Sequence, residues 1–410
     1  MSSHAIVVGA GPVGALSALL LARNDVAVTL IERNESLATA SYAATFHPLT
    51  LDLLESLGIS LENDPEAVSV RSLQWRDGRG AVRAELNYRL LQGLTKHPFR
   101  IHLSQQSLLD RLSKLIHDES KIDFRPGASV ISLDLDHTSV KVSSPLGISE
   151  TLAADIIIGC DGAHSTIRKL AGIGFKAEDY PTSALRAHVR DDLSAMLPKD
   201  VPRPLSGLCY FRDGGDGISV LRMSRDTRLI IRTNHIMEDA ARVAQALENA
   251  TPWTINDLNV HSIDTYRLRH GVADSYLADE SSVMVIGDAA HVTSTAGGLN
   301  MNSGIHDAFA LMPLVADYLQ GKSGKSTVHK IADKRRNYIM TKVIPRSEQR
   351  VQGLEAPDRA ALHAHLLDIT KLSCDHEAAR QFLFEASLLD APVSNHYKNS
   401  ASSSSGRENS

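Results

Sequence analysis

The sequence has few cysteines and lacks metal-ligand spacings, and these absences exclude several kinds of site. Its three cysteines, Cys160, Cys209 and Cys374, are widely separated and form no CxxC pair. This argues against a disulfide framework or a zinc site and is typical of a reducing compartment. The 18 histidines show neither HxxxH nor HExxH spacing, so we expect no metal site.

Charge and hydropathy exclude further classes of protein. The formal net charge of -5, without a block of like charges, gives no attraction to nucleic acid. The N-terminus lacks the cationic start of a secretory signal, and the longest apolar helix, over residues 15–22, is far shorter than the roughly 20 residues that a membrane span needs. We therefore expect a cytoplasmic protein with no membrane span and no nucleic-acid partner, and a homodimer stays open.

Basic residues do cluster late in the chain, but they are interleaved with apolar residues at helical spacing. This pattern predicts a solvated helix face rather than a nucleic-acid patch. The residues concerned are Lys334, Arg335, Arg336, Lys342, Arg346 and Arg350.

The glycines near the N-terminus form a nucleotide-binding pattern. A short apolar strand leads into Gly9, Gly11 and Gly14 and then into the Ala/Leu-rich helix of residues 15–22. Gly9 permits a tight turn, Gly11 lets the backbone approach a pyrophosphate at the helix N-terminus, and Gly14 allows close helix–strand packing. Glu32 ends the next strand, where a carboxylate accepts hydrogen bonds from a ribose. The pattern predicts dinucleotide binding but does not separate NAD from FAD.

Two further motifs follow strands later in the chain. Asp161-Gly162 comes after a buried strand and before Ser165 and Arg168, an arrangement that suits a second contact with a long dinucleotide. Taken alone, that segment also fits an ordinary helix capped by Ser165. Gly287-Asp288 ends the strand of residues 283–286, and we expect His291 to support the turn after Asp288 rather than to act as a base.

The patterns of strands and helices predict the fold class. We expect an α/β protein with a dinucleotide-binding (Rossmann-like) domain, an inserted antiparallel-sheet substrate domain and C-terminal helices. The predicted boundaries are residues 1–68, 101–180 and 275–345 for the dinucleotide domain, a hairpin at 69–100 and a sheet at 181–274 for the substrate domain, helices at 346–392, and a Ser-rich disordered tail at 393–410.

The three motifs, in this order and spacing, resemble the single-component FAD-dependent aromatic hydroxylases, which are p-hydroxybenzoate-hydroxylase-like flavoprotein monooxygenases. The resemblance covers about the first 345 residues. It implies FAD as the resident cofactor, NADH or NADPH as reductant, O2 as co-substrate, and hydroxylation of a small phenolic or N-heteroaromatic substrate through a flavin C4a-hydroperoxide. A flavin oxidase or dehydrogenase on the same fold, and a non-catalytic flavin-binding protein, stay as alternatives.

The resemblance also implies which residues bind the cofactor. Asp288 would bond the ribityl chain, and the loop from Gly297 to Asn302 would lie beside the isoalloxazine, where a helix N-terminus stabilises the anionic reduced flavin. The expected cofactor-binding residues are Gly9, Gly11, Gly14, Glu32, Arg33, Gln105 (with Gln106 as the alternative), Asp161, Gly287, Asp288, Gly298, Leu299, Asn300, Met301 and Asn302.

The substrate site is less well defined by sequence. Each candidate is weighed against a merely hydrogen-bonded strand residue. The candidates for catalysis are Thr295, His47, His188 and Tyr210, and those for substrate binding are Arg186, His188, Tyr210, Arg222 and His270.

Three positions depart from the pattern of the resembled family. Tyr42 stands where many members have an arginine, Ser294-Thr295 where a proline pair is common, and Asn300 where a glycine is usual. Thr295 would add a hydroxyl near the edge of the flavin that reacts with oxygen, which is why the oxidase alternative stays open.

Overall fold

The structure is a computed structural model of the chain. It describes residues 3–37, 43–144, 146–202, 204–212, 217–233, 239–253, 257–278, 282–294, 296–355 and 359–393. Tyr42, Thr295 and the predicted tail from residue 394 onward lie outside the described residues, so the predictions about them stay untested.

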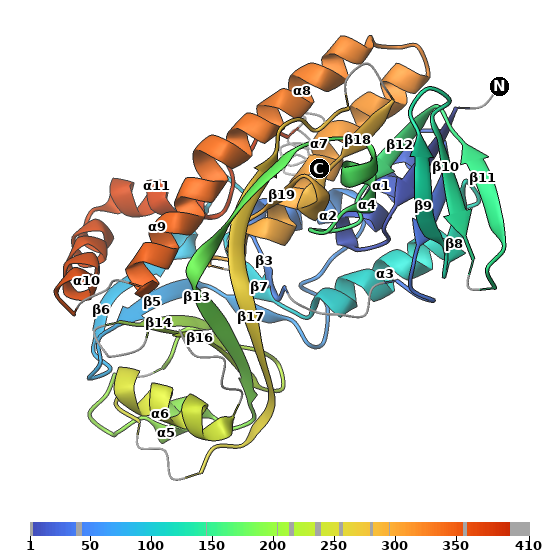
Figure 1. Cartoon of the computed structure of the whole chain (residues 1–410). Coiled ribbons are helices and arrows are strands. Elements are labelled where there is room, and N and C mark those ends of the chain that lie inside the picture. The colour runs from blue at the N-terminus through green and yellow to red at the C-terminus, as the bar shows by residue number, and fades with distance from the viewer. Residues whose placement is uncertain are drawn as a thin grey trace, which may run out of the picture.

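A five-stranded parallel sheet forms one end of the molecule (Figure 1). Every neighbouring pair in it is parallel, and the strands are mostly buried, as expected for a sheet covered on both faces. In order across the sheet, the strands are β18 (Val283–Val285), β12 (Ile156–Gly159), β1 (His4–Val8), β2 (Ala27–Glu32) and β8 (Ile122–Pro126). The three predicted motifs follow β1, β12 and β18, so they meet at the carboxyl edge of one sheet.

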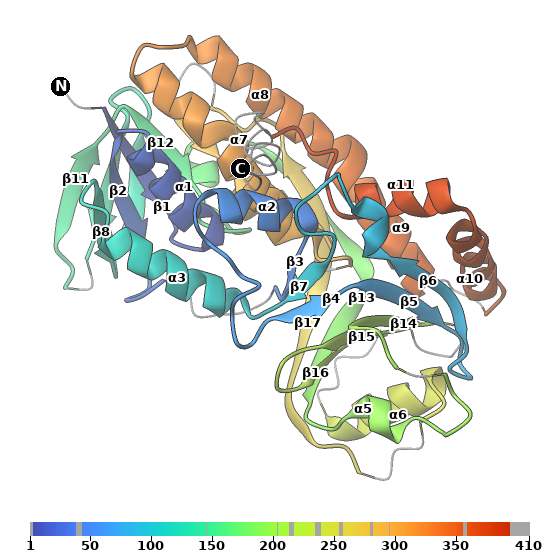
Figure 2. The same cartoon turned by 180° about the vertical axis from the view of Figure 1, so that it is seen from behind.

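Close packing around the first glycine turn depends on two residues without side chains. A Cβ on Gly14, in α1 (Pro12–Arg23), would lie 1.8 Å from the Gly9 carbonyl oxygen. A Cβ on Gly304, in α7 (Leu299–Leu319), would lie 2.8 Å from Val13 Cγ2. Helices from opposite ends of the chain therefore pack tightly at the same turn. Helix α3 (Gln105–His117) also packs against α1 (Figure 2).

A second, eight-stranded sheet lies at the other end of the molecule (Figures 1 and 2). In order, its strands are β19 (His291–Val292), β17 (Val260–Ala273), β13 (Phe175–Val189), β16 (Thr227–Thr233), β15 (Ile218–Arg222), β14 (Leu208–Phe211), β5 (Ser72–Arg76) and β6 (Val82–Asn87). The sequence predicts an antiparallel sheet, but β14 and β5 pair in parallel. The sheet is mixed because the predicted hairpin β5–β6 joins its edge.

Side chains alternate across this sheet and so divide its two faces. Leu229 and Ile231 of β16 pack in an apolar cluster with Val243 and Leu247 of α6 (Ala240–Ala250). The residues between them in β16 point to the opposite face, which looks toward the parallel sheet. Both α6 and the short α5 (Leu193–Met196) lie on the outer face (Figure 2).

Two smaller three-stranded sheets complete the strand structure. In one of them, β9 (Ser129–Asp134) and β10 (Ser139–Ser143) form an antiparallel pair, and β11 (Ser149–Ala153) extends it. The other sheet consists of β3 (Thr45–Phe46), β7 (Arg100–His102) and β4 (Val68–Val70).

Helices dominate after β19, as the sequence predicts. Helix α8 (Lys325–Tyr338), the π-turn η3 (Ile339–Val343) and α9 (Ile344–Glu355) follow one another without a break and run from the parallel sheet toward β5 and β6 (Figure 1). Helices α10 (Arg359–Cys374) and α11 (His376–Ala386) pack on β6 and on the 3-10 turn η1 (Tyr88–Leu91). The remaining helical elements are α2 (Pro48–Ser56), α4 (Thr166–Leu170) and η2 (Gly287–Ala289).

None of the helices in the described parts of the chain combines the length and the apolar character needed to cross a membrane.

Gly14→Ala is expected to lower the free energy of unfolding by about 1–3 kcal/mol, because the new methyl group collides with backbone that has no room to move. Gly11→Ala is the matched control, since a Cβ there meets nothing within 4 Å. Urea unfolding of the two cofactor-free variants, followed by circular dichroism, measures the difference. Equal stability of the two variants would contradict the packing described for α1.

Candidate active site between the two sheets

A cavity of about 610 Å³ lies between the parallel sheet and the eight-stranded sheet, and we call it the main cavity. At one end its wall comes from the turns and loops at the carboxyl edge of the parallel sheet. At the other end it comes from the inner face of β13 to β16, from β5, and from the helices α9 to α11. Of the expected cofactor-binding residues, the main cavity is lined by Gly11, Gln105, Asp288, Gly298, Leu299, Asn300 and Met301.

The first glycine turn leaves room at the cavity wall. Gly9 has a φ of +96°, which favours glycine, and its backbone N–H donates to the Ile31 carbonyl at 2.8 Å. The Cβ position of Gly11 points into open space, and Gly11 itself lines the main cavity beside the N-terminus of α1. A pyrophosphate could therefore approach this backbone closely, as the sequence predicts.

Glu32 stands behind this turn rather than on the cavity wall. Its Oε2 accepts the Ala10 backbone N–H at 2.8 Å, and its Oε1 accepts both the backbone N–H and the side-chain amide of Asn34, at 3.0 and 2.7 Å. The carboxylate is 6% exposed and braces the turn from within the protein. Its predicted bond to a ribose stays a prediction.

The Asp161 motif forms a helix cap and a tie between two motifs. Asp161 accepts hydrogen bonds from the backbone of Thr166 and Ile167, and Ser165 Oγ accepts the Arg168 backbone N–H at 2.9 Å. Arg168 then donates to the Ala289 carbonyl at 2.7 Å, which fixes α4 to the turn that contains Asp288. The helix cap considered from the sequence is thus present, and a cofactor role for Asp161 stays a prediction.

The turn at Gly287 is held by the buried carboxylate of Asp307, in α7. Asp307 Oδ2 accepts the Gly287 N–H at 3.2 Å and His291 Nε2–H at 2.7 Å, and Oδ1 accepts Arg335 Nε–H at 2.8 Å. Burial alone would raise the pKa of Asp307, but Arg335 and His291 outweigh it and lower the pKa to about 2. His291 therefore supports this turn, which is the role expected of it.

Asn300 links the two sides of the loop that would face the flavin. Its side-chain amide donates to Asp288 Oδ1 at 2.8 Å, and its Oδ1 accepts the Thr293 N–H at 3.1 Å. Burial raises the pKa of Asp288. The residue that departs from the usual glycine thus orients Asp288 at the cavity wall.

Two buried side chains outside the main cavity also hold this loop in place. Asn302 donates to the carbonyls of Thr45 and Gly298, at 2.9 and 2.7 Å, and accepts the His47 N–H at 3.0 Å. His47 Nε2 donates to the Gly297 carbonyl at 2.8 Å. Burial holds the pKa of His47 well below its usual range, so this ring is neutral and acts as a brace. Neither side chain lines the main cavity.

Residues 2–347 match the protein family described as FAD binding domain. This match covers most of the chain, including all three motifs at the carboxyl edge of the parallel sheet. The chain belongs to this family. The flavoprotein resemblance predicted from the sequence is therefore confirmed.

Relatives of this flavoprotein are named as aromatic monooxygenases. It is 23% identical to a para-nitrophenol 4-monooxygenase of a Pseudomonas species, over 94% of this chain and 95% of the relative. It is 26% identical to the 6-hydroxy-3-succinoylpyridine 3-monooxygenase of Pseudomonas putida, over 86% and 89%. The crystal structure of a p-nitrophenol 4-monooxygenase from Pseudomonas putida has the same fold, with a TM-score of 0.86, 21% identity, and coverage of 96% of this chain and 99% of that one. The predicted class, a FAD-dependent aromatic monooxygenase, is supported by these relatives.

Two of the predicted substrate residues line the main cavity of this flavoprotein, and three do not. Arg186 and Tyr210 are on its wall. His188 instead pairs with Asp226 at 3.0 Å, Arg222 is exposed at the end of β15, and His270 lies 3.5 Å from Glu348. These three lie outside the lining of the main cavity, which fits the alternative of a hydrogen-bonded or solvated strand residue, because alternation along a strand does not tell how far the cavity extends.

Sequence reasoning missed a set of arginines. On β16, Arg228 and Arg232 share the cavity face with Ile230, whereas Leu229 and Ile231 face α6. The alternation is visible in the sequence, but the sequence does not show that the face with the arginines lines a cavity. Gln105 lines the main cavity, and its alternative Gln106 bonds the exposed Asp110 instead.

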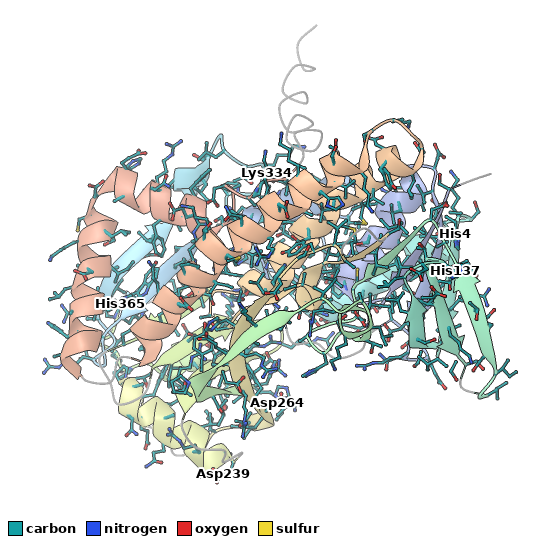
Figure 3. All side chains as sticks on the ribbon, turned by 45° about the horizontal axis from the view of Figure 1, so that its top comes forward. His4, His137, Asp239, Asp264, Lys334 and His365 are labelled. Atoms are coloured by element: carbon teal, nitrogen blue, oxygen red, sulfur yellow. The ribbon has the colours of Figure 1, made fainter. Side chains whose placement is uncertain are left out.

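The predicted solvated helix face was wrong for three of its six basic residues. Arg335 is fully buried against Asp307, Arg346 pairs with Asp390 at 2.6 Å, and Arg350 lines the main cavity. Arg346 and Arg350 are four positions apart on one face of α9, whereas the π-turn η3 separates them from Arg335 in α8. Lys334 and Lys342 are exposed on the other side, as Figure 3 shows for Lys334.

Among the described residues, one group of metal-ligating types comes together outside the main cavity. His188, Asp226 and His261 offer ligand atoms within 4.8 Å of one another. They belong to β13, to the turn before β16, and to β17, so no spacing rule along the sequence could have shown them.

Asp307→Asn is expected to lower the free energy of unfolding by about 3–5 kcal/mol, because it leaves Arg335 buried without a counter-charge. The contribution of this carboxylate should be constant above about pH 4 and be lost as the pH falls toward 2, since its folded pKa is depressed. Chemical unfolding at several pH values measures both effects. Asp25→Asn, in an exposed ion pair with Lys121, is the control. Similar losses in the two variants would contradict the role of Asp307.

Acid should also destabilise the protein through buried neutral histidines. Burial lowers the pKa of His102 to about 4, whereas the same ring in an unfolded chain takes up a proton near pH 6.5. Unfolding therefore takes up a proton between these values, and stability falls as the pH drops. In His102→Gln the slope of unfolding free energy against pH, from 6.5 to 4.5, should decrease by about 1.4 kcal/mol per pH unit. An unchanged slope in urea titrations would show that His102 is not buried and neutral.

Proposed function

We propose that this flavoprotein uses NADH or NADPH and O2 to hydroxylate a small phenolic or N-heteroaromatic compound. The observation that carries the proposal is the main cavity itself, because one continuous space joins the glycine-rich edge of the parallel sheet to an aromatic wall. A cofactor at the first end and a flat substrate at the second would therefore meet inside the protein.

The residues at the first end fit a bound FAD. Gly11 offers backbone at the N-terminus of α1 without a side chain in the way, Gln105 and Asp288 offer polar groups, and α7 begins directly after Gly298. We infer that these residues hold the pyrophosphate, the ribityl chain and the pyrimidine end of the flavin respectively. The bound FAD would supply the electron transfer and oxygen activation that side chains cannot.

At the second end, the eight-stranded sheet would act as the substrate domain. Trp75 and Tyr210 have ring centroids 5.1 Å apart, and Phe382 of α11 lies edge-on to Trp75 at 6.1 Å. All three line the main cavity together with aliphatic residues of β14 to β16. Such a wall favours a flat ring and excludes water from the site of oxygen transfer. The named substrates of the two relatives, a nitrophenol and a hydroxylated pyridine, are rings of this kind.

Two of the departures from the family pattern are accommodated in the structure. Asn300 bonds Asp288, and Ser294 Oγ lies 2.7 Å from Ser347 Oγ, which ties the loop to α9. These bonds keep the loop in place without the usual glycine and prolines. A flavin oxidase on the same fold is the alternative function, and the turnover experiment below distinguishes the two.

Three further predictions from the sequence accompany this proposal. They are the division into a dinucleotide domain and an inserted substrate domain, a cytoplasmic location, and the possibility of a homodimer.

Turnover by the FAD-loaded protein tests the proposal. NADH and NADPH oxidation should be stimulated by a member of a panel of phenols and hydroxypyridines, and the product should carry one oxygen atom from labelled O2, as measured by mass spectrometry. Peroxide formation in place of oxygenated product would support an oxidase instead. A protein that takes up no FAD would overturn the proposal.

Asp288→Ala serves as the matched variant in this experiment. It should weaken FAD binding by roughly tenfold or more, because a polar contact at the cavity wall is lost. Asp123→Ala, in an exposed pair with Arg125 on β8, is the control and should bind FAD normally.

A further inference from the structure

Positive charge dominates the ionisable groups around the main cavity. Seven arginines line it, against two carboxylates, those of Asp288 and Glu385. Two of the arginines form ion pairs on the protein: Arg186 pairs with Asp264 at 2.8 Å, and Arg346 with Asp390 at 2.6 Å. Figure 3 shows Asp264 on β17, at the substrate end of the molecule. Two further arginines, Arg350 and Arg100, line the same cavity.

Arg350, in α9, lies on the wall of the main cavity beside the loop before α7. Its guanidinium packs on Gly297, so closely that a Cβ on that glycine would overlap Nη1. Gly297 has a φ of +83° and is the residue whose carbonyl His47 holds. Nη1 of Arg350 is buried without a hydrogen-bond partner, and no described carboxylate lies within ion-pair distance of this side chain. A donor at the loop beside the expected flavin position is thus left without an acceptor.

Arg100, on β7, is a second cation of this kind. It is 1% exposed, and its Nη2 donates to the Ala386 carbonyl at 3.2 Å. Its Nε is buried without a partner, and among the described residues no carboxylate pairs with it. Arg100 and Arg350 both line the main cavity, and burial, followed by the charge of Arg100, lowers the pKa of Arg350 to about 10.

Two guanidiniums on one cavity wall, each with a buried donor that has no acceptor, are unfavourable unless something offsets them. An anion in the main cavity would satisfy their unused donors, and a planar carboxylate matches the geometry of a guanidinium. The aromatic wall of Trp75 and Tyr210 is part of the same cavity, so the ring of a ligand and its anionic group can be bound together.

We propose that the substrate is an aromatic acid, whose carboxylate is bound by Arg350 and Arg100 while its ring lies against Trp75 and Tyr210. This inference rests on the proposed function and names its substrate class. It assigns to Arg350 the binding of substrate rather than of FAD.

Equilibrium binding to the FAD-loaded protein tests this inference, with pairs of probes that differ in charge but little in shape. The probes are 4-hydroxybenzoate against 4-hydroxybenzamide and 6-hydroxynicotinate against 6-hydroxynicotinamide, followed by changes in the flavin absorption spectrum and by calorimetry. At least one acid should bind about 10- to 100-fold more tightly than its amide, the range expected for hydrogen bonds to a buried charge. Arg350→Met should abolish this preference, Arg350→Lys should restore part of it, and FAD affinity should be unchanged.

Arg125→Met is the matched control, because Arg125 is an arginine on β8 outside the main cavity, and it should keep the full preference. Where Arg350→Met fails to fold, Arg100→Met takes its place in the same comparison. Amides that bind as tightly as the acids, acids that fail to bind, or a variant that weakens both probes equally would overturn the inference. Loss of FAD affinity without loss of the acid preference would assign Arg350 to the cofactor and would also overturn it.

The binding result is separate from the result of turnover. Acids could be preferred in a protein that yields only peroxide, which would contradict the proposed hydroxylation and leave the substrate class intact. Conversely, oxygenation of neutral phenols without acid preference would support the proposed function and reject this inference.

Discussion

The interaction on which the site depends is the buried triad of Asp307, Arg335 and His291. A single carboxylate in the middle of α7 receives the side chains of Arg335 and His291 and the backbone N–H of Gly287. It thereby joins α8, β19 and the turn after β18 in a region closed to solvent. Because Asp288 follows Gly287 directly, the position of the Asp288 carboxyl group on the cavity wall depends on an ion pair that lies outside the cavity. Such a buried pair is costly to form and costly to break, so it favours one arrangement of these elements.

The loop before α7 is likewise held in place by side chains of other elements. His47 and Asn302 hold this loop from below, and Arg350 packs on it from the side of α9. Contacts from two distant parts of the sequence, and from Asn302 in the helix itself, thus converge on the two glycines that open the helix. The long run of α8, η3 and α9 carries both Arg335 of the buried triad and Arg350 of the cavity wall, so one helical run links the two.

The meeting of the three motifs at one edge of the parallel sheet could be predicted from the sequence, because their signals are local. Each glycine or aspartate follows its own strand, and parallel strands bring these positions to one edge without further information. The residues at the other end of the main cavity could not be predicted in the same way. Arg100, Arg350 and Phe382 reach the main cavity from β7, α9 and α11, which meet only through tertiary packing. Helical spacing does place Arg346 and Arg350 on one face, but it cannot tell a solvated face from one that covers a cavity. His188 shows the opposite error, a strand residue on the right face that lies beyond the cavity and pairs with Asp226.

The central claim is that one cavity holds FAD at the edge of the parallel sheet and an aromatic acid against the eight-stranded sheet. A crystal structure of the FAD-loaded protein with 4-hydroxybenzoate tests this most directly. The account predicts the pyrophosphate at Gly11, the aromatic ring against Tyr210, and the carboxylate within hydrogen-bond distance of Arg350. A ring bound outside the main cavity, or a carboxylate directed away from both Arg350 and Arg100, would contradict it.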